Sequence, residues 1–355
     1  MKIAIYSPYL DTLGGGERYI AAIAEILSKK HSVDLFFDNH LQSFGIDILK
    51  KQLSERFNLD LSKVNAIKAP IGTTSSIFQR LLFLRRYDLL IYLTDGSLFL
   101  STAKKNILHI QSPLPGPKSF WGRIKLKSWD VIIYNSQFTK TNSYKNWPIS
   151  SSIVYPPVDV KKIKPLKKKN YILSVGRFFG YLKDKKQEVL IEVFKDLYDT
   201  NEIKNWSLHL AGAASKGDKP YLNELQSLAK GFPIYFYPNL EFEELVKLYG
   251  QSSIYWHASG YKEDDPTRME HFGISTVEAM AGGCVPVVIK KGGQVEIVRD
   301  GKCGFLWDSV DQLKDFTVKL IIDERLRGKM ANVAILEAAR FSKDKFRDSI
   351  LKIIK

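Results

Sequence analysis

Two glutamates, Glu270 and Glu278, lie in the stretch RMEHFGISTVEAM with seven residues between them. The flanking segments SSIYWHA and CVPVVIKKGG are apolar and are typical of buried strands. Ionised carboxylates beside a hydrophobic core are costly unless they are paired or hydrogen-bonded. The two glutamates are therefore either surface charges or groups that bind a ligand.

The local pattern gives the two glutamates different positions. A helix is expected to begin near Ser275 or Thr276, either of which could cap it, and to end at the glycine pair after VEAMA. Glu278 then lies in about the first turn, where a capping-box or helix-dipole role is a structural alternative to binding. Glu270 lies in the loop before the helix and has no such alternative.

Free backbone N–H groups at the start of this helix, at Phe272 and Gly273, would suit a phosphate group. The carboxylates on either side would then be free to accept hydrogen bonds from sugar hydroxyls. The sequence here therefore predicts a site for a ligand that carries both phosphate and sugar.

A second polar cluster is VGRFFGYLKDKKQ, residues 175–187, which follows a strand-like run. Arg177 comes directly after the run, and Lys183, Lys185 and Lys186 follow within nine residues. Arginine offers a fixed fork for phosphate oxygens and lysine a mobile point charge, so together they could neutralise a pyrophosphate leaving group. The alternative is a solvated lysine run at a helix start. Cations there oppose the positive end of the helix dipole, which favours an anionic partner.

The third cluster is GGGE, residues 14–17, between the first expected strand and the first expected helix. Gly15 and Gly16 would let the backbone approach a ligand closely, and the free N–H groups of the helix favour an anion. The dinucleotide-binding pattern G-x-G-x-x-G is absent. A glycine turn that binds nothing explains the same residues.

The elements that must position these clusters are short apolar strands that alternate with helices. Helical spacing is clear in ERYIAAIAEILSKK and in KKQEVLIEVFKDLYD. The expected strands are residues 2–8, 32–37, 87–93, 106–111, 131–136, 171–177, 207–212, 233–238, 253–258 and 285–290. This pattern predicts parallel sheets with helices on both faces, which bind ligands at the carboxyl ends of their strands. All three clusters follow such strands.

The length of 355 residues favours two domains rather than one hydrophobic core. The basic stretch KKIKPLKKK is expected to link them, because it has no periodicity and the alternation of strands and helices restarts after it. We predict an N-terminal domain over 1–165 with the linker near 160–169, a C-terminal domain over 166–340, and a final helix in 341–355 that returns to the N-terminal domain.

The composition, with 45% hydrophobic and 26% charged residues, is typical of a globular chain. No signal peptide and no apolar run of about 18 residues is found, and the two cysteines, Cys284 and Cys303, form no metal-binding pattern with the six histidines. These observations favour a reduced cytoplasmic protein.

The net charge is +15, and residues 1–165, with 23 basic and 12 acidic residues, carry most of the excess. Nucleic acid, anionic lipid, a phosphorylated ligand or a plain solvated surface are each compatible with the charge. Nucleic acid explains neither glutamate. KSFWGRIKLKSW (118–129) interleaves Trp121 and Trp129 with basic residues, and SIFQRLLFLRRYD (76–88) mixes apolar residues with three arginines. We expect these segments to attach peripherally to an anionic membrane; the alternative is that both are ordinary packed helices.

Together the clusters resemble a known family. VGR with a lysine downstream, followed by EHFGISTVEAMAGGCVPVVIKKGG, resembles the retaining glycosyltransferases of family 4, which carry a motif of Glu, seven residues and Glu. GGGERY and EHFG are similar to the dolichol-linked mannosyltransferases of N-glycan assembly and to related bacterial envelope-polysaccharide enzymes. The resemblance covers nearly the whole chain and is most specific between 253 and 307. It implies an α/β chain with the GT-B fold, in which two Rossmann-like doubly wound domains face each other across a cleft.

The resemblance implies roles for these residues in binding a nucleotide sugar. Arg177 and Lys185 would hold the diphosphate and stabilise its departure. Glu270 would contact hydroxyls of the donor sugar, and Glu278 those of the ribose. The remaining contacts to the diphosphate would come from the backbone of Phe272, Gly273 and Ile274, with Gly15 and Gly16 against the diphosphate or the acceptor.

Two of the implied assignments have alternatives. His109 in ILHIQSP would contact the transferred sugar, whereas from the residues alone it is a core histidine with satisfied hydrogen bonds. The spacing after Arg177 is longer than the family's usual one, so either Lys185 or Lys186 could be the phosphate lysine, and QEVLI downstream favours Lys185.

The implied reaction is transfer of a hexose, with retention, from GDP-mannose or a UDP-sugar to a glycan or lipid-linked saccharide in cell-envelope polysaccharide or glycoconjugate synthesis. Neither a cofactor nor a metal is expected, since Asp264 and Asp265 in one loop would form a poor metal cage. The implied location is cytoplasmic, at the inner face of the membrane. The alternative is a sugar-nucleotide epimerase of GT-B architecture, for which His109 is the only obvious acid or base.

Overall fold

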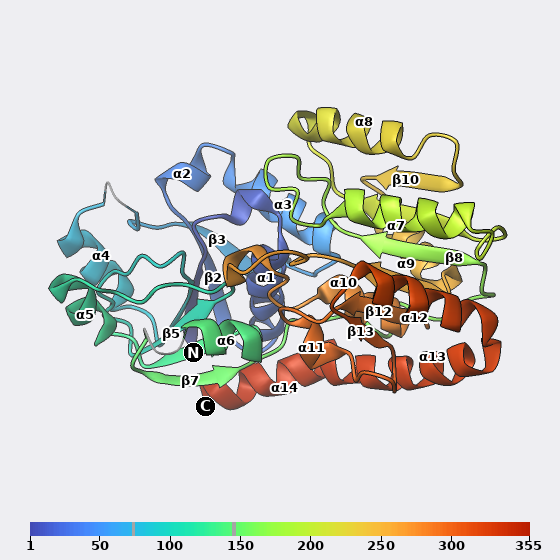
Figure 1. Ribbon diagram of the computed structural model, residues 1–355. Helices are drawn as coiled ribbons and strands as arrows, with labels where there is room; N and C mark the ends of the chain where they lie inside the picture. Colours follow the sequence, from blue (N-terminus) through green and yellow to red (C-terminus); the bar gives the residue numbers. More distant parts are fainter. Residues whose placement is uncertain (73–74, 144–146) are drawn as a thin grey trace. The chain divides into compact units, whose positions relative to one another are not determined.

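The computed structural model describes residues 1–72, 75–143 and 147–355, which form two compact units (Figure 1). Unit 1 comprises Met1–Pro157 and Asp344–Lys355, and unit 2 comprises Val158–Lys343. Each unit has its own parallel sheet and its own buried core. The prediction of an α/β chain with two Rossmann-like, doubly wound domains is confirmed.

Unit 1 is built on a seven-stranded sheet in the order β3-β2-β1-β4-β5-β6-β7, and every strand pair is parallel. Apolar strands of this kind are buried on both faces: Ile3 and Ile5 join one hydrophobic cluster, and Ala4 and Tyr6 join another. The strands are β1 (Lys2–Tyr6), β2 (Ser32–Phe37), β3 (Val64–Lys68), β4 (Leu89–Leu93), β5 (Lys105–Ile110), β6 (Val131–Tyr134) and β7 (Ser150–Ile153).

The helices of unit 1 connect these strands, and the last helix of the chain joins them. They are α1 (Gly15–Ser28), α2 (Asn39–Gln42), α3 (Ile46–Phe57), α4 (Ile77–Leu84), α5 (Phe120–Leu126), α6 (Gln137–Ser143) and α14 (Lys343–Ile354), with a 3-10 turn η1 at Leu10–Thr12. The longest connecting helix, α1, buries the apolar stripe that its spacing predicts, including Ile20, Ile23 and Leu27. Phe346, Ile350 and Ile354 of α14 pack in the same cluster.

Unit 2 repeats this architecture with a six-stranded parallel sheet in the order β10-β9-β8-β11-β12-β13. The strands are β8 (Tyr171–Val175), β9 (Ser207–Gly212), β10 (Ile234–Pro238), β11 (Ile254–His257), β12 (Val285–Ile289) and β13 (Phe305–Trp307). The α-helices are α7 (Gln187–Asp199), α8 (Lys219–Leu228), α9 (Phe242–Gln251), α10 (Ile274–Ala281), α11 (Gln294–Ile297), α12 (Val310–Ile322) and α13 (Glu324–Ala338). The 3-10 turns are η3 (Lys216–Asp218), η4 (Pro266–Arg268) and η5 (Ala339–Phe341).

The basic stretch 161–169 lies within unit 2 and is hydrogen-bonded there. The backbone N–H groups of Leu166 and Lys169 donate to the carbonyls of Gly250 and Gln251 at the end of α9. The Lys168 ammonium donates to the carbonyl oxygens of Ser252 and Gly282.

In each sheet the strand order reverses at one point, between β1 and β4 in unit 1 and between β8 and β11 in unit 2. Loops that leave neighbouring strands in opposite directions open a crevice at the carboxyl ends of those strands, where open α/β sheets bind ligands. The reversal in unit 2 brings the loop after β8, which carries Arg177 and Lys185, beside the loop after β11, which carries Glu270.

Candidate active site

The ion pair between Lys185 and Glu270 joins two of the predicted clusters. The Lys185 Nζ lies 2.8 Å from the Glu270 Oε2, and 3.4 Å from the Asp184 Oδ2. The lysine and the glutamate each keep about 20% of the side chain exposed. Burial disfavours the Lys185 charge, but Glu270 and Asp184 outweigh it and raise the pKa of Lys185. Burial likewise opposes ionisation of Glu270, yet Lys185 and His257 hold the pKa of Glu270 well below its ordinary value. Both groups are therefore charged at neutral pH.

The other two lysines of the run have different carboxylate partners. Lys186 donates to Glu263 over 2.7 Å, and Lys183 donates to Glu224 over 2.9 Å. Lys186 is the N-cap of α7 with a φ of 53°, and its partner Glu263 lies earlier than Glu270 in the same loop after β11. Of the two candidates for the phosphate lysine, Lys185 is the one beside Glu270.

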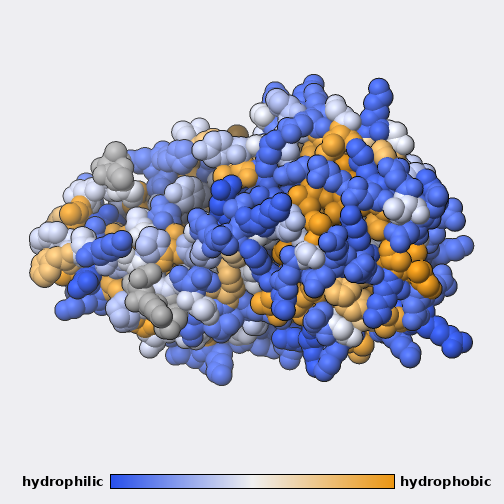
Figure 2. All heavy atoms as spheres, in the orientation of Figure 1, coloured by the Kyte–Doolittle hydropathy of each residue, from blue (hydrophilic) through white to orange (hydrophobic). Residues whose placement is uncertain are grey.

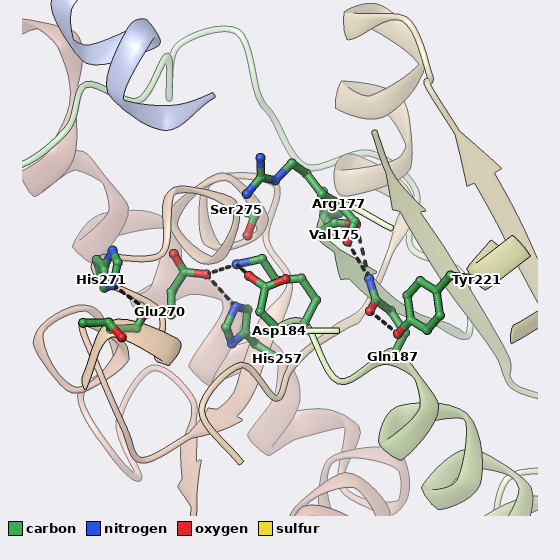
Figure 3. A network of polar contacts seen from close by, with 12 residues as sticks. Val175, Arg177, Asp184, Gln187, Tyr221, His257, Glu270, His271 and Ser275 are labelled. Atoms are coloured by element: carbon green, nitrogen blue, oxygen red, sulfur yellow. Dashed lines mark hydrogen bonds and ion pairs between the residues drawn. The ribbon is translucent and has the colours of Figure 1, made fainter. Parts of the chain in front are cut away.

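Arg177 lies just after β8, separated from it by Gly176, and its side chain is exposed. The guanidinium lies over the Phe179 ring at 5.3 Å, while the Arg177 carbonyl accepts a hydrogen bond from the Gln187 amide at 3.0 Å. Its charge lies near enough to Lys185 to oppose the lysine's ionisation. Figure 3 shows Glu270, His257 and Asp184 gathered together, with the Arg177 side chain drawn beside Ser275.

The helix after Glu270 begins one residue earlier than the sequence predicted. Helix α10 starts at Ile274 with Gly273 as its N-cap, and neither Ser275 nor Thr276 caps it. Gly273 has a φ of 118°, which a residue with a side chain rarely adopts. The Ser275 hydroxyl instead accepts a hydrogen bond from Tyr255 at 2.8 Å. The first turn of α10 is therefore preceded by a glycine in the left-handed conformation, with the side chains of Gln294 and Ile297 close to it.

The loop that carries Glu270 is fixed by two glycines that the sequence analysis did not single out. The N–H of Gly293 donates to the Glu270 carbonyl at 2.7 Å. A Cβ on Gly292 would collide with that same carbonyl oxygen, and one on Gly293 would collide with the Phe272 backbone. Phe272 is buried and meets the ring of Phe341 edge-on at 5.3 Å. Close packing of Gly292 and Gly293 against this backbone thus fixes the position of the Glu270 main chain, from which its side chain extends.

Glu278 is buried rather than exposed, and it is not a capping residue. It is the fifth residue of α10, beyond the positions that cap a helix. The Tyr249 hydroxyl donates to its Oε2 at 3.0 Å, and burial together with Glu278 raises the pKa of Tyr249. Glu270 and Glu278 therefore have separate surroundings within unit 2.

His257 is a site residue that sequence reasoning missed. It is the last residue of β11, it is 3% exposed, and its Nε2 lies 3.1 Å from the Glu270 Oε2. In the sequence it stands within the apolar strand SIYWHA, with no other polar residue of the candidate site nearby. Its position at the carboxyl end of a predicted strand was the signal that would have identified it.

The candidates in unit 1 lie near its own point of strand reversal. Gly14 caps α1, and the Glu17 carboxylate accepts from the Gly14 N–H at 2.8 Å. Gly15 is exposed, whereas Gly16 is buried, and a Cβ on Gly16 would press against Leu93 and Gln111. The glycines at 14–16 thus form the start of α1, and its first residue, Gly15, is exposed to solvent.

His109, in β5, is fully buried and stacks on Tyr19 with 3.9 Å between the ring centroids. Its Nδ1 lies 3.1 Å from the Ile133 carbonyl oxygen, and its Nε2 lies 3.0 Å from the Oε1 of Gln111. Both partners are oxygen acceptors, so a neutral ring, which carries one N–H, donates to one of them at a time. Burial lowers the pKa of His109 to about 4, so the ring is neutral at pH 7. The structure therefore buries His109 with a polar partner near each ring nitrogen, as expected of a core histidine, and the partly buried Gln111 lies next to it.

The two basic, aromatic segments of unit 1 form helices α4 and α5, with two corrections. Trp129 is buried and donates to the Phe99 carbonyl, and the Arg80 guanidinium is buried against the Phe99 ring. Both residues therefore anchor the helices instead of facing solvent. The exposed large apolar residues of the two segments are Ile77, Phe78, Leu82, Phe120 and Trp121.

The acidic pair in the loop after β11 has a local structural role. Asp265 caps the 3-10 turn at Pro266–Arg268 by accepting from the Thr267 N–H at 2.8 Å. Within residues 1–72, 75–143 and 147–355, no group of three or more His, Cys, Asp or Glu side chains is arranged to hold a metal ion. No helix within the same described ranges is long and apolar enough to cross a membrane.

The family model for glycosyl transferases group 1 matches residues 158–336, which is half of the chain and nearly all of unit 2. The chain therefore belongs to this family. The match includes the loops after β8 and β11 and the start of α10. It gives no support to the sugar-nucleotide epimerase alternative.

Curated relatives include several glycosyltransferases. The GDP-Man:Man(3)GlcNAc(2)-PP-Dol alpha-1,2-mannosyltransferase of Xenopus laevis is 29% identical over 244 residues, which cover 62% of this chain and 48% of the relative. The D-inositol 3-phosphate glycosyltransferase of Corynebacterium jeikeium is 30% identical over 161 residues, covering 44% and 36% of the two chains. The chain spans about half the length, or less, of these relatives.

Solved structures share the fold over the full length. The Anabaena protein HepE, solved with UDP and glucose, has a TM-score of 0.74 at 19% identity and covers 100% of this chain and 99% of its own. A glycosyltransferase from Rickettsia africae has a TM-score of 0.75 at 17% identity, covering 100% and 97%. These neighbours confirm the GT-B fold that the resemblance implied.

Proposed function

We propose that the protein transfers a hexose from a nucleoside-diphosphate sugar to a glycan or lipid-linked saccharide, with retention at the anomeric carbon. The observation that carries the proposal is the charged pair Lys185–Glu270, placed beside Arg177 and before the glycine-capped start of α10. A cationic group and a carboxylate held next to each other suit a ligand that has phosphate on one side and sugar hydroxyls on the other.

Transfer breaks the bond between the anomeric carbon and the diphosphate, so negative charge grows on the leaving phosphate. Arg177, Lys185 and the N–H groups at the start of α10 are the donors that would stabilise this charge. The charge of Lys185 is secured before the donor arrives, because its carboxylate neighbours raise its pKa. These groups supply the stabilisation without a metal ion, so we expect no metal requirement.

The sugar and the ribose would be held by the two glutamates. Glu270 uses its Oε2 for Lys185 and His257, which leaves Oε1 to accept from donor-sugar hydroxyls. Glu278 would accept from the ribose hydroxyls and is held by Tyr249. The names of the relatives and neighbours make GDP-mannose and UDP-sugars the first donors to test. Gly15, Gly16 and His109 of unit 1 would lie on the acceptor or transferred-sugar side.

The test is incubation with a panel of sugar nucleotides, in which nucleotide release with and without saccharide acceptors is measured. Arg177→Ala and Glu270→Ala should each lower the rate by about 100-fold or more, since each removes one preorganised contact to the transition state. Arg325→Ala is the matched control, because Arg325 is also an exposed arginine of unit 2. Wild-type rates in the Arg177 or Glu270 variants would remove that residue from the mechanism, and no release from any donor would reject the proposed function.

We also propose that unit 1 attaches peripherally to an anionic membrane through α4 and α5, which implies a cytoplasmic protein at the inner face of the membrane and a lipid-linked acceptor. The five exposed apolar side chains of these helices include Phe78, Phe120 and Trp121, each at least 70% exposed. Figure 2 displays hydrophobic atoms at the surface over these helices. Residues 76–88 and 118–129 contain seven lysines and arginines and one acidic residue, Asp88. A cationic surface with exposed aromatic residues suits an anionic lipid interface.

Vesicle flotation tests the attachment. Binding to vesicles of phosphatidylcholine with anionic phosphatidylglycerol should be strong at low salt and should fall as salt rises. Phe120→Ser with Trp121→Ser should reduce binding several-fold. Ile322→Ser is the control, because Ile322 is equally exposed but lies on α12 of unit 2. Equal loss in the control, or no binding to anionic vesicles at all, would contradict the proposed surface.

A further inference from the structure

The carboxylate of Glu270 is held by two donors that come from different parts of unit 2. Lys185, in the loop after β8, and His257, at the end of β11, both bind the same oxygen, Oε2, at 2.8 and 3.1 Å. The Glu270 backbone is fixed separately, through the hydrogen bond from Gly293. The orientation of the carboxylate therefore depends on these two side chains.

Once a sugar nucleotide is bound, Lys185 would have to interact with the diphosphate as well as with Glu270. Its ammonium has three N–H groups, and Asp184 and Glu270 already lie close to it. A diphosphate at this site would compete for the same ammonium, and the bond from Lys185 to Glu270 would weaken as negative charge grows on the leaving phosphate. Among the residues that the structure describes, His257 is the other side chain that donates to this carboxylate.

The surroundings of His257 indicate a residue selected for this contact. Its Nδ1 is buried and has no hydrogen-bond partner among the residues that the structure describes. An unpaired polar atom in the core costs stability, and natural proteins tolerate such costs mainly at functional sites. His209, on β9 of the same sheet, is equally buried but has partners for both ring nitrogens, Ser207 and Tyr237. The contrast indicates that the hydrogen bond from Nε2 of His257 to Glu270 is the contact that matters.

We propose that His257 is a positioning residue for transfer: its Nε2–H holds Glu270 so that Oε1 faces the donor sugar while Lys185 turns to the leaving phosphate. The inference rests on the proposed function, because it assigns a partner to the proposed sugar-binding carboxylate. It predicts an effect on turnover rather than on nucleotide binding, since the nucleotide end would be held at Glu278 and the start of α10.

The experiment measures nucleotide release from GDP-mannose and UDP-glucose, together with the binding of GDP and UDP by calorimetry. His257→Ala should lower kcat by about 10-fold. Loss of a hydrogen bond that orients a binding group typically lowers activity by roughly 10- to 100-fold. The KM for the donor and the affinity for GDP or UDP should stay within about 2-fold of wild type. His257→Gln should restore most of kcat, since its amide N–H can reach the position of Nε2. His209→Gln, the matched control, should leave kcat unchanged.

A double-variant comparison separates positioning from a general structural role. If His257 acts through Glu270, adding His257→Ala to Glu270→Ala should lower the residual rate by less than 2-fold. A further 10-fold loss in that background, or wild-type kcat in His257→Ala, would overturn the inference. A loss of GDP and UDP affinity in His257→Ala as large as the loss of kcat would also overturn it, because that outcome indicates a disturbed fold. No release of nucleotide by the wild-type protein would instead remove the proposed function and this inference with it.

Discussion

Lys185 and Lys186 are adjacent in sequence, and the structure offers a way to test which one acts on the phosphate. Both ammonium groups are ion-paired with a glutamate, at 2.8 and 2.7 Å, and both side chains are mostly buried, with 20% and 17% exposed. Lys185→Met and Lys186→Met therefore remove one charge each and the lysine partner of one glutamate, Glu270 or Glu263. Each glutamate keeps a second partner, His257 at 3.1 Å or Arg268 at 3.4 Å, and Lys185→Met also removes the longer contact to Asp184.

The two variants should lose similar stability but very different activity. Removing the lysine from a largely buried carboxylate that keeps a second partner costs up to about 3 kcal/mol, which for a unit of this size lowers Tm by up to roughly 6 to 12 °C. The activity loss depends on whether the lost charge faced the leaving phosphate. Removal of one preorganised donor costs about 3 kcal/mol of transition-state stabilisation, or 100- to 1,000-fold in kcat. We expect that loss for Lys185→Met and less than a 3-fold change for Lys186→Met.

The assay is nucleotide release from the preferred donor at saturating concentration, at a temperature well below both Tm values, with thermal denaturation in parallel. The ratio of the two rates is independent of stability if the two Tm shifts agree. Equal rates in the two variants, or a larger loss for Lys186→Met, would refute the assignment of the phosphate to Lys185.

Three further predictions concern stability and binding. The pKa of Glu270 is lowered from 4.5, and the pKa of Lys185 is raised from 10.5. The contribution of Glu270 to stability is therefore complete above about pH 4.5 and is lost as the pH falls through its folded pKa. The contribution of Lys185 is complete below about pH 10.5 and is lost as the pH rises through its folded pKa. Denaturation across pH should therefore show the largest stability gap between wild type and Glu270→Gln at intermediate pH, and a constant gap would contradict the coupling. Gly273→Ala should destabilise unit 2 by about 1 to 3 kcal/mol, because its φ of 118° is strained for alanine and the Cβ would meet the Gln294 amide; chemical denaturation measures the loss, and wild-type stability would show that the backbone can relax. Tyr249→Phe removes the hydrogen bond to Glu278 and should weaken GDP or UDP binding by about 5-fold, or 1 kcal/mol, in calorimetry; unchanged affinity would separate Glu278 from the ribose.

The strands of the two sheets were predictable to the extent that they are apolar and central. Ten expected strands correspond to strands of the structure, and β2 and β9 have the predicted bounds. The three that were missed, β3, β7 and β13, each form an edge of a sheet. Edge strands have fewer buried neighbours and need less hydrophobic sequence: β7 reads SSSI, and β13 has three residues. Periodicity therefore identified the central strands of each sheet and, of the four edge strands, β10 alone.

The candidate site was predictable where a residue follows a strand and not where its partner is distant. Arg177, Lys185 and Glu270 could be found because they lie in loops that follow apolar strands, where parallel sheets bind ligands. The pairing of Lys185 with Glu270, 85 residues apart, depends on the adjacency of β8 and β11, which no local pattern encodes. The role of His257 could not be predicted either. It lies within an apolar strand, and its contact with Glu270 depends on how the loop after β11 folds back.

The final helix gives unit 1 an order of assembly during synthesis. Phe346 of α14 meets the Tyr19 ring edge-on at 4.9 Å, and Tyr19 in turn stacks on His109. The Lys105 ammonium also donates to the carbonyl of Ile353 at 2.6 Å. A ribosome that has made residues 1–157 has therefore not yet made the helix that completes this core. Unit 2 is synthesised as one uninterrupted segment and can fold first, whereas unit 1 must wait, incompletely packed around His109, until the last dozen residues of this chain emerge.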